Sequence, residues 1–176
     1  MKVFIAGPRA ISSLNVKVKD RLNNIMNNEF TVIVGDANGI DKAIQKYFNE
    51  VNYNNIMIYA TNGKARNNIG DWKVVKVDVP PNTKGFNYYA AKDIEMAKNA
   101  NYGFMIWNGK SKGTLNNIIN LIKFGKSVLV YFIPAKNFYE IKNFKDIKQL
   151  TNKCDTSINQ LINELLNSST QLTLNI

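Results

Sequence analysis

The feature that most constrains this chain is a repeated unit in which a short apolar run ends in a glycine loop and an amphipathic segment follows. The run at 2–7 leads into Gly7-Pro8-Arg9, and the run at 31–34 leads into a loop bounded by Gly35 and Gly39. Apolar residues spaced three and four apart then follow each loop, as on one face of a helix. Short strands that alternate with helices predict an α/β fold built on a parallel sheet.

We therefore predict a Rossmann-like three-layer domain with a doubly wound, mostly parallel sheet. The run at 102–107 is almost continuously apolar, which is typical of a strand buried on both faces. A helix is expected over 87–99. The predicted strands are Met1–Ala6, Thr31–Val34, Asn55–Ala60, Trp72–Val79, Tyr102–Trp107 and Ser127–Ile133.

A length of 176 residues is that of a single domain. The alternating pattern weakens after Pro134, so we expect 135–176 to form a C-terminal helical extension of the one domain at 1–176. Its last helix carries Leu161, Ile162, Leu165 and Leu166, and we expect it to pack on the sheet or to mediate self-association in a homo-oligomer.

The composition excludes several classes of site. The chain has no histidine and one cysteine, Cys154, so histidine-based catalysis, Cys/His zinc sites and internal disulfides are excluded. We expect Cys154 to be structural or simply a surface residue. No apolar stretch approaches the roughly 20 residues of a membrane-spanning helix, and we expect a cytoplasmic protein without a membrane anchor.

Charge and residue usage indicate the kind of partner. Lys and Arg total 23 against 13 for Asp and Glu, and the formal net charge of +10 favours anionic ligands. Asparagine occurs 28 times, so no single Asn is assigned a function on its residue type alone. Heavy use of Asn, Lys and Ile fits an AT-rich genome of bacterial or phage origin.

Three loops are placed to bind a ligand. Ligands of open parallel sheets bind outside the carboxyl ends of the strands, where unpaired amides at helix starts attract phosphate. Residues 7–9, 35–39 and 109–114 are the loops at these places, and the third is the most specific because it combines two glycines, two lysines and two hydroxyls. It lacks the glycine spacing of a Walker A motif, and no Gly-x-Gly-x-x-Gly is present, so we expect no NAD bound in the dehydrogenase manner, no other cofactor and no metal.

Several of these segments resemble the SLOG superfamily over roughly residues 1–133. The resemblance rests on Gly-Pro-Arg after the first strand, Gly-Asp-Ala-x-Gly-Ile-Asp at 35–41, Lys92-Asp93-x-x-Met96-Ala97, and Gly-x-x-x-Gly-Thr at 109–114. The superfamily includes the Lonely Guy phosphoribohydrolases, the DNA-processing protein DprA, YspA-like proteins and nucleotide-sensing domains of bacterial immunity systems. The resemblance implies a Rossmann-like fold and a nucleotide ligand at the strand ends.

Departures from the phosphoribohydrolase pattern bear on catalysis. Lys92 stands at its arginine, Asp93 at its lysine and Asn108 at its proline, while Asn116 and Asn117 replace its two glutamates. An amide can hold a ribose hydroxyl but cannot act as a base. The resemblance therefore implies that phosphate binding is retained and that glycosidic cleavage is not, and we lean against an enzyme.

The residues that we expect to contact the ligand are Gly7, Pro8, Arg9, Gly35, Asp36, Ala37, Gly39, Asp41, Lys92, Trp107, Asn108, Gly109, Lys110, Ser111, Lys112, Gly113 and Thr114. If catalysis remains, its candidate carboxylates are Asp41 and Asp93. Asp93 and Glu95 are two apart on a predicted helix, and we expect them to form a solvated polar face rather than an acid/base pair. Tyr88, Tyr89 and Trp107 are more commonly core residues than partners that stack on a base.

Three functions remain open at this level. The first is the binding of a phosphorylated nucleoside or a nucleotide-derived signal, such as an ADP-ribose derivative or a cyclic nucleotide, in phage defence or anti-defence. The second is an enzyme that cleaves or exchanges an N-glycosidic bond, as phosphoribohydrolases and nucleoside deoxyribosyltransferases do. The third is nucleic-acid binding, which we rank last because the lysines form no evident stripe.

Overall fold

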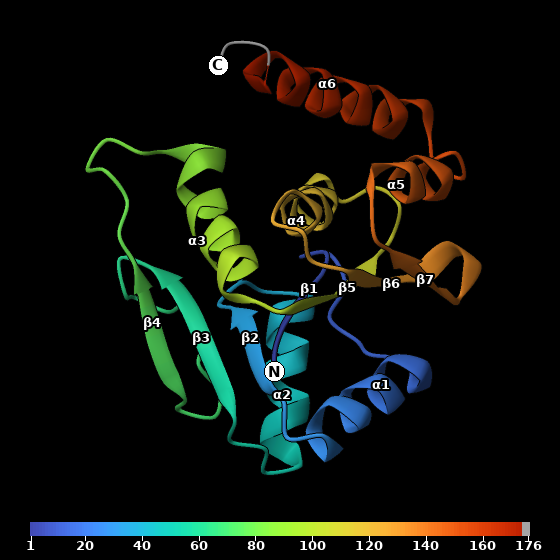
Figure 1. The fold of residues 1–176 in the computed structure, drawn as a ribbon. Helices are drawn as coiled ribbons and strands as arrows, with labels where there is room; N and C mark the ends of the chain where they lie inside the picture. Colours follow the sequence, from blue (N-terminus) through green and yellow to red (C-terminus); the bar gives the residue numbers. More distant parts are fainter. Residues whose placement is uncertain (174–176) are drawn as a thin grey trace.

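A computed structural model describes residues 1–173, and for Phe86 and residues 165–173 it describes the backbone alone. One seven-stranded sheet runs through the molecule in the order β4-β3-β2-β1-β5-β6-β7 (Figure 1). The first six strands are parallel and β7 is antiparallel to β6. The strands are β1 (Lys2–Ala6), β2 (Thr31–Gly35), β3 (Ile56–Thr61), β4 (Lys73–Val77), β5 (Tyr102–Trp107), β6 (Val128–Phe132) and β7 (Asn137–Ile141). The predicted α/β class is confirmed, and each of the six expected strands is present within one or two residues of its predicted ends.

Helices cover both faces of this sheet. The described helices are α1 (Val16–Asn27), α2 (Ile40–Glu50), α3 (Gly85–Asn99), α4 (Lys112–Lys123), α5 (Phe144–Thr151) and α6 (Thr156–Thr173), with a short 3-10 turn at Ile133–Ala135. Of these, α6 lies outside the layers that contact the sheet. Alternate strand residues face opposite sides, so Val3 and Ile5 pack with α1 and α2 whereas Phe4 packs with α3 and α4. Two buried cores result, one on each face of the sheet. None of the described helices is long and apolar enough to cross a membrane.

We expected the segment after Pro134 to be helical, and this expectation is wrong for its first part. The strand β7 precedes the two helices α5 and α6. Lys136 adopts a left-handed conformation that reverses the chain, and β7 then pairs with β6 from Phe132↔Asn137 to Val128↔Ile141. Only Ile141 of this edge strand is buried. A strand paired on one side and exposed along most of its length needs no apolar run, which is why the sequence pattern did not reveal it.

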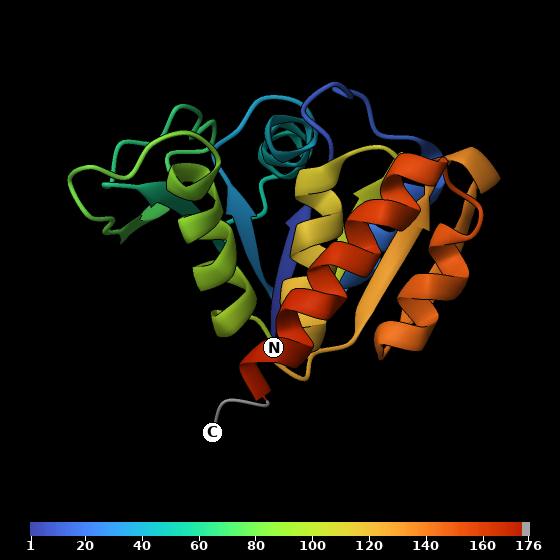
Figure 2. The same cartoon turned by 90° about the horizontal axis from the view of Figure 1, so that it is seen from above.

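The final helix does not pack on the sheet. Figures 1 and 2 show α6 lying across the outer side of α4 and beside α5. Ile158 and Ile162 are buried in the same core as the apolar face of α4. The side chains of Leu165 and Leu166, which we expected to complete this apolar face, lie outside the described residues.

The strand order fixes where a crevice opens. The chain proceeds from β1 outward to β4, and α3 then carries it back so that β5 pairs with the other side of β1. The direction of winding thus reverses between β1 and β5. In open α/β sheets a crevice forms outside the carboxyl ends of the strands at this reversal.

Candidate functional site

A cavity of about 460 Å³ lies at the carboxyl ends of the central strands. Four segments line it: the end of β1 and the loop after it, the start of α2 with the loop before it, the inner face of α3, and the amino end of α4. The lining residues are Ala6, Gly7, Arg9, Ala37, Asp41, Gly85, Tyr89, Ala90, Lys92, Asp93, Met96, Ser111, Lys112, Gly113, Thr114 and Asn117. The cavity therefore lies at the reversal of winding, where the fold places ligands.

The floor of the cavity is a buried cluster of charges around Lys92. The Lys92 side chain is only 4% exposed, and its Nζ lies 2.8 Å from Asp93 Oδ1 and 3.9 Å from Asp36 Oδ1. Asp41, also buried, packs beside them against the backbone of Gly35. A Cβ at Gly35 would lie 2.5 Å from Asp41 Oδ2 and 2.7 Å from Lys92 Nζ, so only glycine leaves room for this cluster.

The three acids of the cluster are not equivalent. Burial raises the pKa of Asp41 to about 7, and the nearby Lys92 offsets only part of that effect. Burial also acts on Asp36, but hydrogen bonds from Arg66 and the charge of Lys92 together hold its pKa below the ordinary value. Burial disfavours the charged form of Lys92, but the nearby Asp93, Asp41 and Asp36 raise its pKa overall. Lys92 therefore stays a cation. Near neutral pH Asp41 therefore readily gains or loses a proton.

This asymmetry predicts a specific pH dependence. The folded protein holds the Asp41 proton up to about pH 7, whereas the unfolded chain loses it near pH 3.8. The contribution of Asp41 to the free energy of unfolding therefore falls as the pH rises from about 4 to 7 and is constant above that. Asp41→Asn keeps an acceptor for the Ala37 amide and should remove this fall. The difference in the free energy of unfolding, variant minus wild type, should therefore be larger at pH 8 than at pH 5 by a few kcal/mol.

Urea unfolding at pH 5 and pH 8 measures the effect. Asp20→Asn, a change to an exposed residue of α1, is the matched control and should leave the pH profile unchanged. If Asp41→Asn follows the wild-type profile, Asp41 is ionised throughout and its raised pKa is wrong.

Asp36 does not line this cavity but anchors a neighbouring loop. Its carboxylate accepts hydrogen bonds from the Arg66 side chain at 2.9 and 2.7 Å and from the Arg66 amide at 3.1 Å. Asn67 donates to the carbonyl of Asp36 at 2.8 Å. The loop that follows β3 is thus fixed against the carboxyl end of β2. The sequence analysis did not identify Arg66 as a residue near the site. The available indication was an arginine in a glycine-containing loop that follows a strand at the same edge of the sheet.

The amino end of α4 is built to present its backbone amides to the cavity. Ser111 caps the helix by accepting from the Thr114 amide, and Asn108 Oδ1 accepts from the amides of Lys110 and Ser111 at 3.1 and 2.9 Å. The amides of Lys112 and Gly113, the first two helical residues, have no acceptor inside the helix. A Cβ at Gly113 would meet no atom within 4 Å. An anion can therefore approach these two amides directly.

A further buried polar residue lines the same cavity. Asn117 lies one turn along α4, is 5% exposed, and its Oδ1 has no hydrogen-bond partner among the described residues. A buried amide oxygen without a partner is costly, and a ligand hydroxyl or N–H would satisfy it. Asn117 stands where the phosphoribohydrolase pattern has a glutamate, so the sequence comparison had already drawn attention to this position.

The structure brings only some of the expected ligand residues together. Nine of them line the cavity: Gly7, Arg9, Ala37, Asp41, Lys92, Ser111, Lys112, Gly113 and Thr114. Eight do not: Pro8, Gly35, Asp36, Gly39, Trp107, Asn108, Gly109 and Lys110. Several of these eight contact the lining residues and hold them in place. Gly39, for example, has φ +81°, and a Cβ there would collide with the backbone of Pro8 and Arg9, so the first two loops touch through it.

Trp107 and Asp93 occupy different environments from those expected. Trp107, placed among the ligand contacts, is fully buried in the core under α4, and its indole N–H donates to the Ser111 carbonyl at 3.0 Å. This hydrogen bond ties the loop at Ser111 to the core. Asp93, expected on a solvated face, lines the cavity and pairs with Lys92. Glu95 does face solvent, where it approaches Lys98 at 3.9 Å.

Tyr89 marks the rim of the cavity. Its ring is partly exposed, and the guanidinium carbons of Arg9 and Arg66 lie 4.9 and 5.0 Å from the ring centroid. A smaller hollow of about 160 Å³, lined by Asp36, Lys64 and Arg66 among others, adjoins it on the loop after β3 and shares Tyr89 with the main cavity. The rim thus offers an aromatic face flanked by two cations, a combination suited to a nucleobase.

Comparisons with known proteins bear on the fold. No protein-family model matches the chain, and no curated protein matches it. Among solved structures it is similar to DNA processing protein A from Helicobacter pylori, a structure described for its single-stranded DNA binding mode. The similarity has a TM-score of 0.58 at 13% sequence identity and covers 96% of this chain and 81% of that one. At this identity the likeness establishes a shared Rossmann-like fold.

Proposed function

We propose that the chain binds a nucleotide or a nucleotide-derived molecule in the cavity at the carboxyl ends of the strands. The observation that carries the proposal is that one cavity combines the open amino end of α4 at Gly113 with the buried, unpartnered oxygen of Asn117. The first suits a phosphate and the second suits a hydroxyl or an N–H of the same ligand. Two nearby cations, Arg9 and Lys112, add charge at the same cavity.

The carboxylates at the floor of the cavity favour a sugar over a second phosphate in that part of the cavity. Asp41 and Asp93 both line the cavity, and carboxylates repel phosphate but accept hydrogen bonds from ribose hydroxyls. At the rim, Tyr89 and the Arg9 and Arg66 guanidinium groups over its ring together offer planar surfaces for the base. The proposed ligand therefore places its phosphate on α4, its sugar over Asp41 and Asp93, and its base near Tyr89.

Single-stranded DNA is the second candidate. The Helicobacter pylori protein with the similar fold binds single-stranded DNA, and the net charge of +10 together with the Tyr89, Arg9 and Arg66 rim is compatible with such a partner.

An N-glycosidic enzyme would have to use Asp41 or Asp93, the two carboxylates that line the cavity.

Isothermal calorimetry with AMP, ADP, ADP-ribose, a cyclic dinucleotide, 2′-deoxy-AMP and a thymidine oligonucleotide separates these candidates. We expect a ribonucleotide to bind with Kd well below about 1 mM, and more tightly than its 2′-deoxy counterpart. DNA binding would instead show affinity that rises with oligonucleotide length and falls steeply with salt. Release of free base from AMP, lost in Asp93→Asn, would indicate the enzyme.

Matched lysine variants test the phosphate end. Lys112→Ala removes a cation that lines the cavity and should weaken nucleotide binding by about tenfold or more, since a charge-assisted hydrogen bond contributes roughly 1.5–3 kcal/mol. Lys110→Ala removes an exposed lysine two residues earlier that does not line the cavity and should leave the affinity nearly unchanged. Equal effects of the two changes would mean that only the general positive charge of the loop matters.

A further inference from the structure

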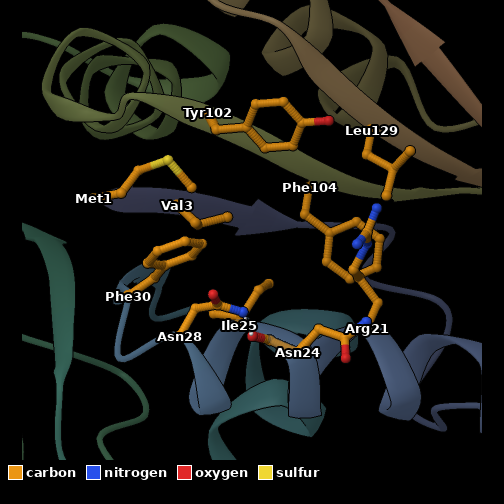
Figure 3. Close-up of a pocket in the computed structure, with 10 residues that line it drawn as sticks. All are labelled: Met1, Val3, Arg21, Asn24, Ile25, Asn28, Phe30, Tyr102, Phe104 and Leu129. Atoms are coloured by element: carbon orange, nitrogen blue, oxygen red, sulfur yellow. Dashed lines mark hydrogen bonds between the residues drawn. The ribbon is translucent and has the colours of Figure 1, made fainter.

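A second cavity lies near the opposite end of the strands, between α1 and the sheet (Figure 3). Its volume is about 190 Å³, and it is partly open to solvent. Its sheet side is formed by Val3, Tyr102 and Leu129, which stand at or near the starts of β1, β5 and β6, and its helix side by α1. The candidate nucleotide site lies at the carboxyl ends of these strands, so the two cavities share no residue.

Apolar side chains form most of the wall of this second cavity. Val3, Ile25, Phe104 and Leu129 line it and are otherwise buried, and Phe30 closes one side. An apolar cavity of about 150 Å³ is known to accept benzene, so a volume of 190 Å³ has room for one six-membered ring and a few further atoms. The cavity is therefore the size of a small aromatic or branched aliphatic group.

A single cation stands among these apolar residues. Arg21 rises from α1, and Figure 3 shows its side chain passing Phe104 toward Leu129. The side chain is half-buried, yet no carboxylate of the described residues lies within ion-pair distance of it; Glu140, on the nearby edge strand β7, pairs with Lys142 instead. A half-buried guanidinium without a counter-ion binds an anion strongly, in the bidentate geometry that suits a carboxylate.

A hydroxyl group accompanies the cation. Tyr102 lines the same cavity, and burial together with the charge of Glu140 raises the pKa of its phenol. The hydroxyl thus keeps its proton at neutral pH and can donate a hydrogen bond. Arg21 and Tyr102 are thus two donors in the lining that are suited to a carboxylate; Asn24 and Asn28 are its other polar side chains, and the remaining lining residues are apolar.

We propose that this cavity binds a small organic carboxylate with an aromatic or branched aliphatic body, its carboxylate on Arg21 and its body against Val3, Ile25 and Phe104. The volume matches one ring and a few further atoms, which favours a free small molecule as the occupant. This site is independent of the proposed nucleotide site and does not rest on it.

Titration of the full chain with phenylacetate, followed by calorimetry and by NMR of the methyl groups of Val3, Ile25 and Leu129, tests the proposal. We expect saturable binding at one site and at least about tenfold weaker binding of benzyl alcohol, which has a similar body and no charge. Arg21→Met keeps the aliphatic stem and should weaken phenylacetate binding by about tenfold or more while leaving benzyl alcohol unaffected. Lys19→Met removes an exposed cation of the same helix outside the cavity and should change neither.

A filling variant completes the test. Asn24 lines the cavity from an exposed position of α1, so Asn24→Trp can occupy the space without disturbing the buried core and should abolish binding. The proposal is overturned if phenylacetate fails to saturate the wild-type chain, if Arg21→Met binds it unchanged, or if Asn24→Trp still binds it. It is also overturned if sedimentation shows a dimer that Asn24→Trp dissociates and phenylacetate does not, because a second copy of the chain would then be the occupant.

Discussion

Replacing Lys92 with methionine is expected to lower the free energy of unfolding by about 3–5 kcal/mol at pH 8, the cost of leaving buried carboxylates without their cation. Lys92 is buried among Asp36, Asp41 and Asp93, and methionine fills a similar volume without the charge. With total stabilities of about 5–15 kcal/mol for typical domains, this is a large fraction. Urea unfolding at constant ionic strength measures it.

The same variant should show a signature that a simple packing defect does not produce. At pH 5 the protonation of Asp41 relieves part of the excess negative charge, so the loss of stability should be clearly smaller there than at pH 8. Lys98→Met, on the same helix but exposed and only 3.9 Å from Glu95 at the surface, is the control and should change stability by less than about 0.5–1 kcal/mol. A pH-independent loss, or one no larger than that of the control, would contradict the central role of Lys92.

Gly113→Val is expected to weaken nucleotide binding by about a hundredfold or more while leaving stability nearly unchanged. The new side chain meets no protein atom at its Cβ, so the fold accommodates it, but it adds bulk to the cavity lining beside the amides of Lys112 and Gly113. Loss of two charge-assisted hydrogen bonds to a phosphate, each about 1.5–3 kcal/mol, accounts for the expected change. Calorimetry with the tightest-binding nucleotide of the panel and a parallel urea unfolding curve provide the two readouts.

Two further variants separate blockage from a change in the helix. Gly113→Ala introduces a single methyl group and should have a smaller effect of the same sign. Ser157→Val places valine at the corresponding second position of α6, which is exposed, and should alter neither binding nor stability by a measurable amount. Retention of full affinity in Gly113→Val would show that the phosphate does not lie at the amino end of α4.

The sheet could be predicted because the buried strands carry their pattern in consecutive residues. The run Tyr102–Trp107 is buried on both faces, so no polar residue interrupts it. The edge strand β7 lacks this property, since its pairing with β6 uses backbone atoms while Asn137 and Glu140 face outward. Backbone pairing at an edge leaves little trace in side-chain polarity, and the strand was missed for that reason.

The site could be predicted only where backbone and loops define it. Gly113 and Ser111 follow directly from a glycine-rich loop at a helix start. The positions of Tyr89 and Asp93 depend on how α3 is rotated against the sheet, which the sequence did not fix, and the position of Arg66 depends on how a loop folds back over Asp36. For Trp107 the sequence left both a ligand contact and a core position open, because an aromatic residue at the end of a strand can face either way; in the structure it lies in the core.

The two margins of the sheet carry a consequence for assembly. At one margin, β4 has Lys73 exposed and Lys76 paired only with Asp78 at the surface; at the other, β7 exposes Asn137 and Glu140 and is followed by Lys142. Charged side chains at an open margin oppose the addition of a strand from another molecule, because pairing would remove water from those charges. Any self-association of this chain should therefore proceed through its helical faces, and the sheet should remain closed to growth by β-augmentation even at high protein concentration.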